Sequence, residues 1–220
     1  MTGAAQVRTR QPSSAPLCPS TPAQKRAIAR SVASCQFAAF PGAIGPQWLT
    51  ALQDEAAALF SGAARAEGTG RLRYRANITG LGDVALGFLT HPDLLTLLSR
   101  HFGGDYALTP EISCLTFYDE SGHLGAHLDE PAARCAVTII LYLAADSPDP
   151  QAPETGLVLN VYGIERASVG DARLRIPTRA GTLVLGRGSR VWHERPPLGR
   201  GESVTAITGC YHMAGTGQNG

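Results

Sequence analysis

The chain has 220 residues, of which 44% are hydrophobic, and it carries 19 Lys and Arg against 18 Asp and Glu. This length and apolar content are sufficient for one domain with a substantial core. The near-balance of charge argues against the strong positive field with which nucleic-acid-binding proteins attract their ligands. No apolar run approaches the length that spans a bilayer. We therefore expect a small-molecule partner, with no nucleic acid and no membrane.

The cysteines are odd in number, lie far apart and include no C-x-x-C pair. Such spacing indicates neither a zinc site nor a redox motif. Arg8 and Arg10 are followed by Pro and Ser rather than by the apolar stretch of a secretory signal. The sequence thus predicts a cytoplasmic protein and leaves its oligomeric state open. Reduced thiols are expected at Cys18, Cys35, Cys114, Cys135 and Cys210.

The first half of the chain predicts a tail followed by helices. Residues 1–25 have almost no large apolar side chains, so they are expected to form a flexible tail. Residues 26–220 are expected to form a single domain, with helical support over about 26–105 and a barrel over about 106–212. Pro46 opens a run in which apolar residues recur at helical spacing up to Phe60. A second helix is predicted from Pro92 to the glycines at 103 and 104.

From residue 111 onward, short runs rich in β-branched and aromatic residues predict strands. Segments rich in Pro and Gly separate these runs without any βαβ alternation, which favours an antiparallel sandwich or barrel over a Rossmann fold. The predicted strands cover residues 112–118, 136–143, 157–162, 182–185 and 204–211.

The motif that carries chemistry is His127-Leu128-Asp129, read together with the distant His193. Residues i and i+2 of an extended strand point to the same face, so His127 and Asp129 can offer an imidazole and a carboxylate to one metal. With His193, they make the two-His, one-carboxylate set of non-heme Fe(II) oxygenases. The alternative is a surface pair or a hydrogen-bonded couple that fixes a turn. A helical zinc pair of His123 and His127 is improbable because Gly122 and Gly125 disfavour a helix there.

The segment from about Pro110 to His212 resembles the Fe(II)- and 2-oxoglutarate-dependent oxygenases, and within them the prolyl-hydroxylase-like group. The resemblance rests on Tyr118 upstream of His127, on the strands at 134–143 and 155–159, and on His193-Glu194 followed by Pro197. It implies a mainly β fold with N-terminal helices, a double-stranded β-helix of the jelly-roll or cupin-like kind. It also implies Fe(II), 2-oxoglutarate and O2 as cofactors.

The resemblance further implies an activity and a set of site residues. His127, Asp129 and His193 would bind the iron, and the hydroxyls of Tyr118 and Tyr142 would contact 2-oxoglutarate. The expected reaction is hydroxylation, or another oxidation, of an unactivated C–H bond, with 2-oxoglutarate converted to succinate and CO2. The expected substrate is a small molecule such as an amino acid or a natural-product intermediate. A carboxylate at position 129 argues against halogenation, since related halogenases have Gly or Ala there.

The chain departs from the family at the basic residue that normally pairs with the far carboxylate of 2-oxoglutarate, because Ser203 or Val204 stands at its place. We favour Arg200 as the substitute, with Arg195, Arg175 and Arg187 as weaker candidates.

Three alternative functions stay open. The missing basic residue motivates an iron oxygenase that does not use 2-oxoglutarate. A protein-directed or peptide-directed prolyl hydroxylase and a non-catalytic barrel that binds a ligand are the others. The arginines Arg71, Arg73 and Arg75 suit a carboxylated or phosphorylated substrate, and a solvated basic loop is the alternative for them.

Overall fold

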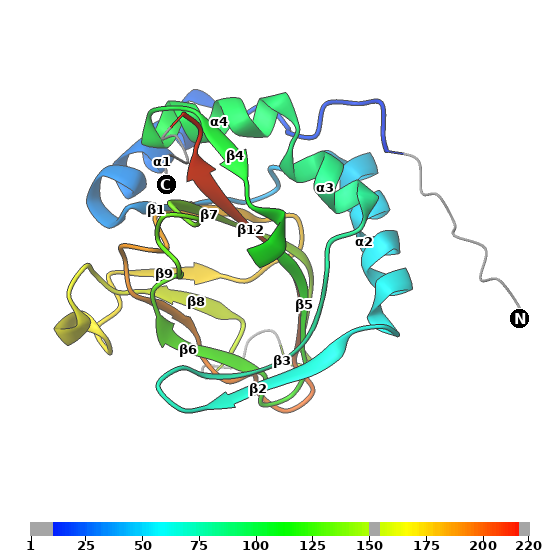
Figure 1. The fold of residues 1–220 in the computed structure, drawn as a ribbon, viewed down its shortest axis with the longest axis vertical. Helices are drawn as coiled ribbons and strands as arrows, with labels where there is room; N and C mark the ends of the chain where they lie inside the picture. Colours follow the sequence, from blue (N-terminus) through cyan, green and yellow to red (C-terminus); the bar gives the residue numbers. More distant parts are fainter. Residues whose placement is uncertain (1–10, 150–154, 216–220) are drawn as a thin grey trace, which may run out of the picture.

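The computed structural model describes residues 11–149 and 155–215 of the chain. Figure 1 shows its helices around the top and right of a curled sheet. The helices are α1 (Pro22–Cys35), α2 (Pro46–Phe60), α3 (Asp83–Leu89) and α4 (Pro92–Phe102), and the 3-10 turns are η1 (Pro110–Ile112) and η2 (Arg166–Ser168). The strands are β1 (Phe37–Phe40), β2 (Ala64–Thr69), β3 (Arg73–Thr79), β4 (Tyr106–Leu108), β5 (Cys114–Tyr118), β6 (His123–His127), β7 (Val137–Asp146), β8 (Val158–Val161), β9 (Leu174–Pro177), β10 (Leu183–Gly186), β11 (His193–Arg195) and β12 (Ser203–Met213).

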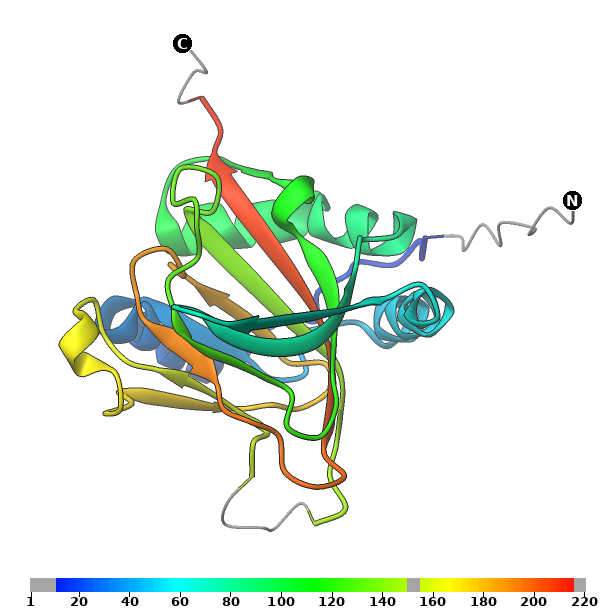
Figure 2. The same ribbon diagram turned by 60° about the horizontal axis from the view of Figure 1, so that its bottom comes forward.

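The strands form one continuous antiparallel sheet that curls into a barrel. Its order is β1-β10-β7-β12-β5-β3-β6-β11-β8-β9, with β2 added beside β3 and β4 beside β12. Figure 2 shows the sheet wrapping around an interior, with the helices outside it. The mainly β architecture with N-terminal helices, a double-stranded β-helix, is therefore confirmed. Within the described residues, no helix is both long and apolar enough to cross a membrane.

Helices α2 and α4 match their predicted bounds. Proline stands in the first turn of each, where its missing N–H costs no hydrogen bond. Trp48, Leu52 and Ala56 line one buried face of α2. Helix α4 ends where Gly103 takes a φ of 71°, a backbone conformation that side chains with a Cβ rarely adopt. Both helices could be predicted because their boundaries are set by local residues.

Helix α1 begins at Pro22, inside the segment that was expected to be a tail. A capping box forms its start: the Thr21 side chain accepts from the N–H of Gln24 at 3.2 Å, and the Gln24 side chain accepts from the N–H of Thr21 at 2.8 Å. Ile28 is its buried anchor. The low apolar content of this segment led to the prediction of a tail, although the capping-box pattern Thr21-x-x-Gln24 indicates a helix start. Residues 1–10 of the expected tail lie outside the described residues.

The arginine-rich segment before α3 is a β-hairpin, β2–β3, where the sequence suggested a basic loop. Its register pairs Glu67 with Arg75 across the two strands. Glu67 Oε1 lies 2.8 Å from Arg65 Nε and 3.6 Å from Arg75 Nε. The first half of the chain therefore contributes strands as well as helices, and two of its arginines are paired with an acid.

Cys135 and Cys210 form a disulfide, so the expectation that all five cysteines are reduced thiols was wrong for this pair. Strand pairing of β7 with β12 brings together two buried cysteines that are 75 residues apart in sequence. No spacing motif could reveal this pairing. Cys18, Cys35 and Cys114 are free thiols. The cytoplasmic location stays a prediction.

The buried apolar residues form two clusters. We call the larger one, between the helices and the outer face of the sheet, the helix-side core; it includes Trp48, Leu52, Leu94, Leu98, Ile139, Leu141 and Leu185. We call the smaller one, inside the barrel, the barrel core; it includes Phe37, Tyr142, Leu159, Val161, Ile176 and Val204. Strand β7 contributes to both because its successive side chains point to opposite faces.

Candidate active site

Three side chains that are distant in sequence converge at one end of the barrel core. His127 is the last residue of β6, Asp129 follows it, and His193 is the first residue of β11. Antiparallel pairing of β11 with β6 places His193 directly opposite His127, with ring centroids 4.2 Å apart. One ligand atom from each of the three residues lies within 4.8 Å of the others. The arrangement brings together the set that the sequence predicted.

The backbone orients both imidazoles. His127 Nδ1 lies 2.9 Å from the carbonyl oxygen of Gly125, and His193 Nδ1 lies 2.9 Å from that of Val191. A carbonyl oxygen only accepts, so each Nδ1 donates a hydrogen, and in the neutral form of such an imidazole the lone pair lies on Nε2. These Nε2 atoms lie 3.3 and 3.7 Å from Asp129 Oδ1. Both imidazoles are therefore fixed in the tautomer that binds a metal through Nε2.

Asp129 is held from its other side. Its Oδ2 accepts a short hydrogen bond from the Thr138 hydroxyl, and its backbone N–H donates to Gly188 O at 3.0 Å. A Cβ at position 188 would overlap both the carboxylate and the hydroxyl, so only glycine fits there. These contacts leave Oδ1 facing the two imidazoles.

Electrostatics keep Asp129 and His193 in protonation states that suit metal binding. Burial alone would raise the pKa of Asp129, but His193 and His127 lower it overall, well below its ordinary value. Burial lowers the pKa of His193 to about 4, with a further contribution from His127. At neutral pH the site thus holds an ionised carboxylate and a neutral His193 imidazole.

A cavity, which we call the inner cavity, extends from the triad into the barrel core. Arg195, Tyr118 and Tyr142 lie along its walls. The guanidinium carbon of Arg195 is 5.2 Å from the Tyr118 ring centroid and 5.1 Å from that of Tyr142. Arg195 is only 4% exposed and donates to the Thr178 hydroxyl at 3.1 Å.

The inner cavity has the features of an anion site. Within the described part of the chain, no carboxylate pairs with the Arg195 guanidinium. The Tyr142 hydroxyl is buried with no hydrogen-bond partner among these residues. Burial raises the pKa of Tyr118 to about 12, so its hydroxyl stays protonated and able to donate. A buried cation and an orphaned donor are costly unless a negatively charged ligand satisfies them.

The other arginines considered from the sequence lie elsewhere. Arg200 is exposed in the turn before β12 and does not line the inner cavity, and Arg175 is exposed on β9. Arg187 donates to the carbonyl oxygen of Phe102 at 3.0 Å. The sequence places Arg195 only among the weaker candidates, although it stands two residues after His193 on the same strand. The two-residue repeat that linked His127 to Asp129 was the signal that could have placed it inside.

Comparison with known proteins identifies the fold. No family model matches the chain, and a search of curated proteins finds no match either. Solved structures do match it, and they show that the chain has the double-stranded β-helix fold of 2-oxoglutarate- and Fe(II)-dependent oxygenases, prolyl hydroxylases among them.

Three of these structures illustrate the likeness. A prolyl-4-hydroxylase of Pseudomonas putida is 18% identical, covers 86% of this chain and 98% of its own, and has a TM-score of 0.62. A prolyl hydroxylase of Trichoplax adhaerens, solved with a peptide fragment of hypoxia inducible factor, is 19% identical over 84% of this chain and 87% of its own, with a TM-score of 0.65. The α-ketoglutarate-dependent epimerase SnoN from nogalamycin biosynthesis is 17% identical over 88% of this chain and 84% of its own, with a TM-score of 0.71. SnoN is also known in complex with Fe3+, α-ketoglutarate and nogalamycin RO.

Proposed function

We propose that this protein is an Fe(II)- and 2-oxoglutarate-dependent oxygenase that hydroxylates or otherwise oxidises an unactivated C–H bond of a small molecule. The observation that carries the proposal is the convergence of His127, Asp129 and His193, with their ligand atoms within 4.8 Å of one another. Two imidazoles and one carboxylate are the donor set that would hold Fe(II) and leave positions free for a cosubstrate and O2.

The donor atoms fit iron. Both imidazoles present Nε2 to one point because their Nδ1 atoms are tied to carbonyls. Asp129 contributes one oxygen, because Thr138 holds the other. Fe(II), when bound with 2-oxoglutarate and O2, supplies an oxidant strong enough to remove a hydrogen atom from a C–H bond, with succinate and CO2 as coproducts.

We propose Arg195, rather than Arg200, as the residue that anchors 2-oxoglutarate. The far carboxylate of this dianion would pair with the guanidinium and accept from the Tyr142 hydroxyl, which has no partner among the described residues. Tyr118 borders the same cavity. Arg195 on β11 supplies the positive charge that the chain lacks at Ser203 and Val204. Its presence favours an iron oxygenase that uses 2-oxoglutarate over one that does not.

The remaining walls of the inner cavity have a simpler role. Leu124, Ile140 and Leu159 line it beside the polar residues. Apolar walls exclude water, which strengthens the pairing of Arg195 with an anion and protects the reacting centre. The chain's own contribution is therefore to hold the metal on one side, fix the cosubstrate and keep the site dry.

The test is an anaerobic titration of Fe(II) and 2-oxoglutarate followed by absorption, with succinate measured after O2 is admitted. We expect a visible charge-transfer band that needs both ligands, and succinate that forms only in their presence. Isothermal titration that shows no binding of divalent metal would instead favour a non-catalytic barrel.

Peptide oxidation is the second candidate function, because two of the similar structures are prolyl hydroxylases. Incubating the loaded enzyme with proline-containing peptides separates the two candidates. A peptide that gains the mass of one oxygen atom at turnover rates would favour the peptide substrate. We expect succinate release without such a product.

A further inference from the structure

A second cavity, which we call the outer cavity, lies against His127 and differs in character from the inner one. Its volume is about 140 Å³. It is lined by Arg71, Leu72, Ala126, His127, Leu128, Glu130, Arg166 and Trp192. These residues come from the tip of the β2–β3 hairpin, the end of β6, the turn η2 and the residue before β11. His127 lines both cavities, so a molecule in the outer cavity lies beside a metal ligand.

Two arginines in the outer cavity have no acidic partner within the described residues, Arg71 and Arg166. Arg65 and Arg75 on the same hairpin contrast with them, because both contact Glu67. Glu130 is the one acidic side chain among the residues that line the outer cavity, so its walls carry a net positive charge. An anion is the complementary ligand.

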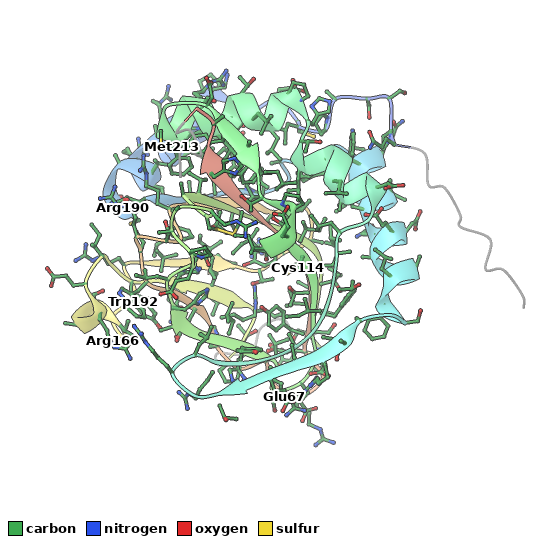
Figure 3. All side chains as sticks on the ribbon, viewed as in Figure 1. Glu67, Cys114, Arg166, Arg190, Trp192 and Met213 are labelled. Carbon is green, nitrogen blue, oxygen red and sulfur yellow. A yellow bond between two sulfur atoms is a disulfide. The ribbon has the colours of Figure 1, made fainter. Side chains whose placement is uncertain are left out.

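The Arg166 guanidinium stacks on the ring of Trp192. Its guanidinium carbon lies 4.9 Å from the centroid of the Trp192 ring, and Figure 3 shows the two labelled side chains next to each other. Stacking on an aromatic face leaves the N–H groups at the guanidinium edge available for a bidentate contact with an oxyanion. Leu72, which is 36% exposed, adds an apolar surface to the same cavity.

We infer that the outer cavity is the substrate subsite, and that it binds a small molecule bearing an oxyanion, a carboxylate or a phosphate, next to an apolar group. The oxyanion pairs with Arg71 and Arg166, and the apolar group packs on the partly exposed Leu72. This inference rests on the proposed function only in naming the bound molecule as substrate. The cavity's volume of about 140 Å³ admits one compact group.

The experiment measures binding to the metal-free protein, so it does not depend on turnover. The probes are cyclohexanecarboxylate, its neutral amide and cyclohexylphosphonate, titrated by calorimetry with ligand-observed NMR for weak binding. We expect the carboxylate or the phosphonate to bind at least tenfold more tightly than the amide. The tighter of the two anions identifies the carboxylated or the phosphorylated class of substrate.

Matched arginine variants assign the binding to this cavity. We expect Arg71→Gln and Arg166→Gln each to weaken binding of the anion about five- to tenfold. Arg73→Gln on the same hairpin and Arg173→Gln after the same turn should leave it unchanged, since both residues are as exposed as Arg71 and Arg166 but neither lines the cavity. Glu130→Gln should tighten binding, because it removes the negative charge from the wall.

The inner anion site must be separated from the outer one. In Arg195→Met protein, the anion should still bind and still respond to Arg166→Gln. Equal affinity for the amide and the carboxylate, or full binding by the Arg71 and Arg166 variants, would overturn the inference. Loss of anion binding through Arg195→Met alone would also overturn it, because the probe would then occupy the inner cavity. A failure of succinate formation with intact anion binding would instead count against the proposed function.

Discussion

The helix-side core and the interior of the barrel are built from alternate residues of the same strands. On β7, Ile139, Leu141 and Leu143 face the helices, whereas Thr138 and Tyr142 line the inner cavity. The first set is apolar and fully buried. The second set carries hydroxyls, one bonded to Asp129 and one without a partner among the described residues.

The two faces of the sheet therefore have different roles: one stabilises the fold, and the other provides the candidate active site. The helix-side core buries large apolar side chains from α2, α3 and α4 against one face of the sheet, and this burial stabilises the fold. The interior contains polar groups that favour ligand binding over maximal stability. Rigid strands hold both sets, so the site is positioned by the same packing that stabilises the fold. Changes to the two faces should therefore have separable effects.

The largest expected effect is on metal binding. His127→Ala removes one of three ligand atoms, and we expect it to abolish binding of Co(II), used as a spectroscopic substitute for Fe(II), with little change in melting temperature. His123→Ala is the control, because His123 lies on the same strand and outside the triad. Wild-type affinity in the His127 variant would remove the basis of the proposed function.

The next largest effect is expected on protein stability, from a change in the helix-side core. Leu98 on α4 is fully buried, so Leu98→Ala should lower the free energy of unfolding by about 2–5 kcal/mol through lost burial and a residual cavity. Denaturant unfolding measures the change, with the exposed neighbour Thr96→Ala as control. The folded variant should bind metal normally. Weaker metal binding by the folded protein would show that the two faces are coupled.

A smaller effect is expected on the affinity for the cosubstrate 2-oxoglutarate. Arg195→Met removes the buried cation, and we expect the affinity for 2-oxoglutarate to fall roughly ten- to hundredfold, the equivalent of about 1.5–3 kcal/mol for a hydrogen bond to a charged group. Metal affinity should not change. Anaerobic titration of the iron-loaded protein measures both. Arg200→Met is the control, and a larger loss in that variant would restore Arg200 as the anchor.

The smallest effect concerns a residue that acts through a metal ligand. Thr138 donates to Asp129 Oδ2, so Thr138→Val should let the carboxylate rotate and weaken metal binding about tenfold. Thr138→Ser, which keeps the hydroxyl, should restore it. Equal metal affinities in the two variants would mean that Thr138 only fills space. The comparison is made by competition with a chelator of known affinity.

Local signals account for the parts of the molecule that the sequence predicted. Helices α2 and α4 follow from the spacing of apolar residues and from the prolines and glycine at their ends. The strands after residue 111 follow from their composition, and the two-residue repeat placed His127 and Asp129 on one face. His193 was predicted as the third ligand from the chemistry of the donor set, and the pairing of β11 with β6 is what brings it opposite His127.

Only the tertiary structure placed residues that depend on distant pairing. The Cys135–Cys210 disulfide was missed because no short-range pattern marks which distant strands become neighbours. The local hairpin β2–β3 was missed for another reason: its strands are mostly exposed or half-buried and polar, so they lack the apolar pattern of a buried strand. Arg195 was underrated for the same reason as the disulfide, since a sequence shows that a residue shares a face with His193 but not which cavity that face encloses.

The amino-acid sequence by itself determined helices α2 and α4, the strands after residue 111 and the ligand chemistry, because helix ends, side-chain periodicity and donor atoms are properties of neighbouring residues. The barrel decided which arginine lines the inner cavity and which arginines lie at the outer cavity. The reason is physical: closure of the sheet sets distances between residues far apart in the chain, and burial then determines which charges need a ligand as partner.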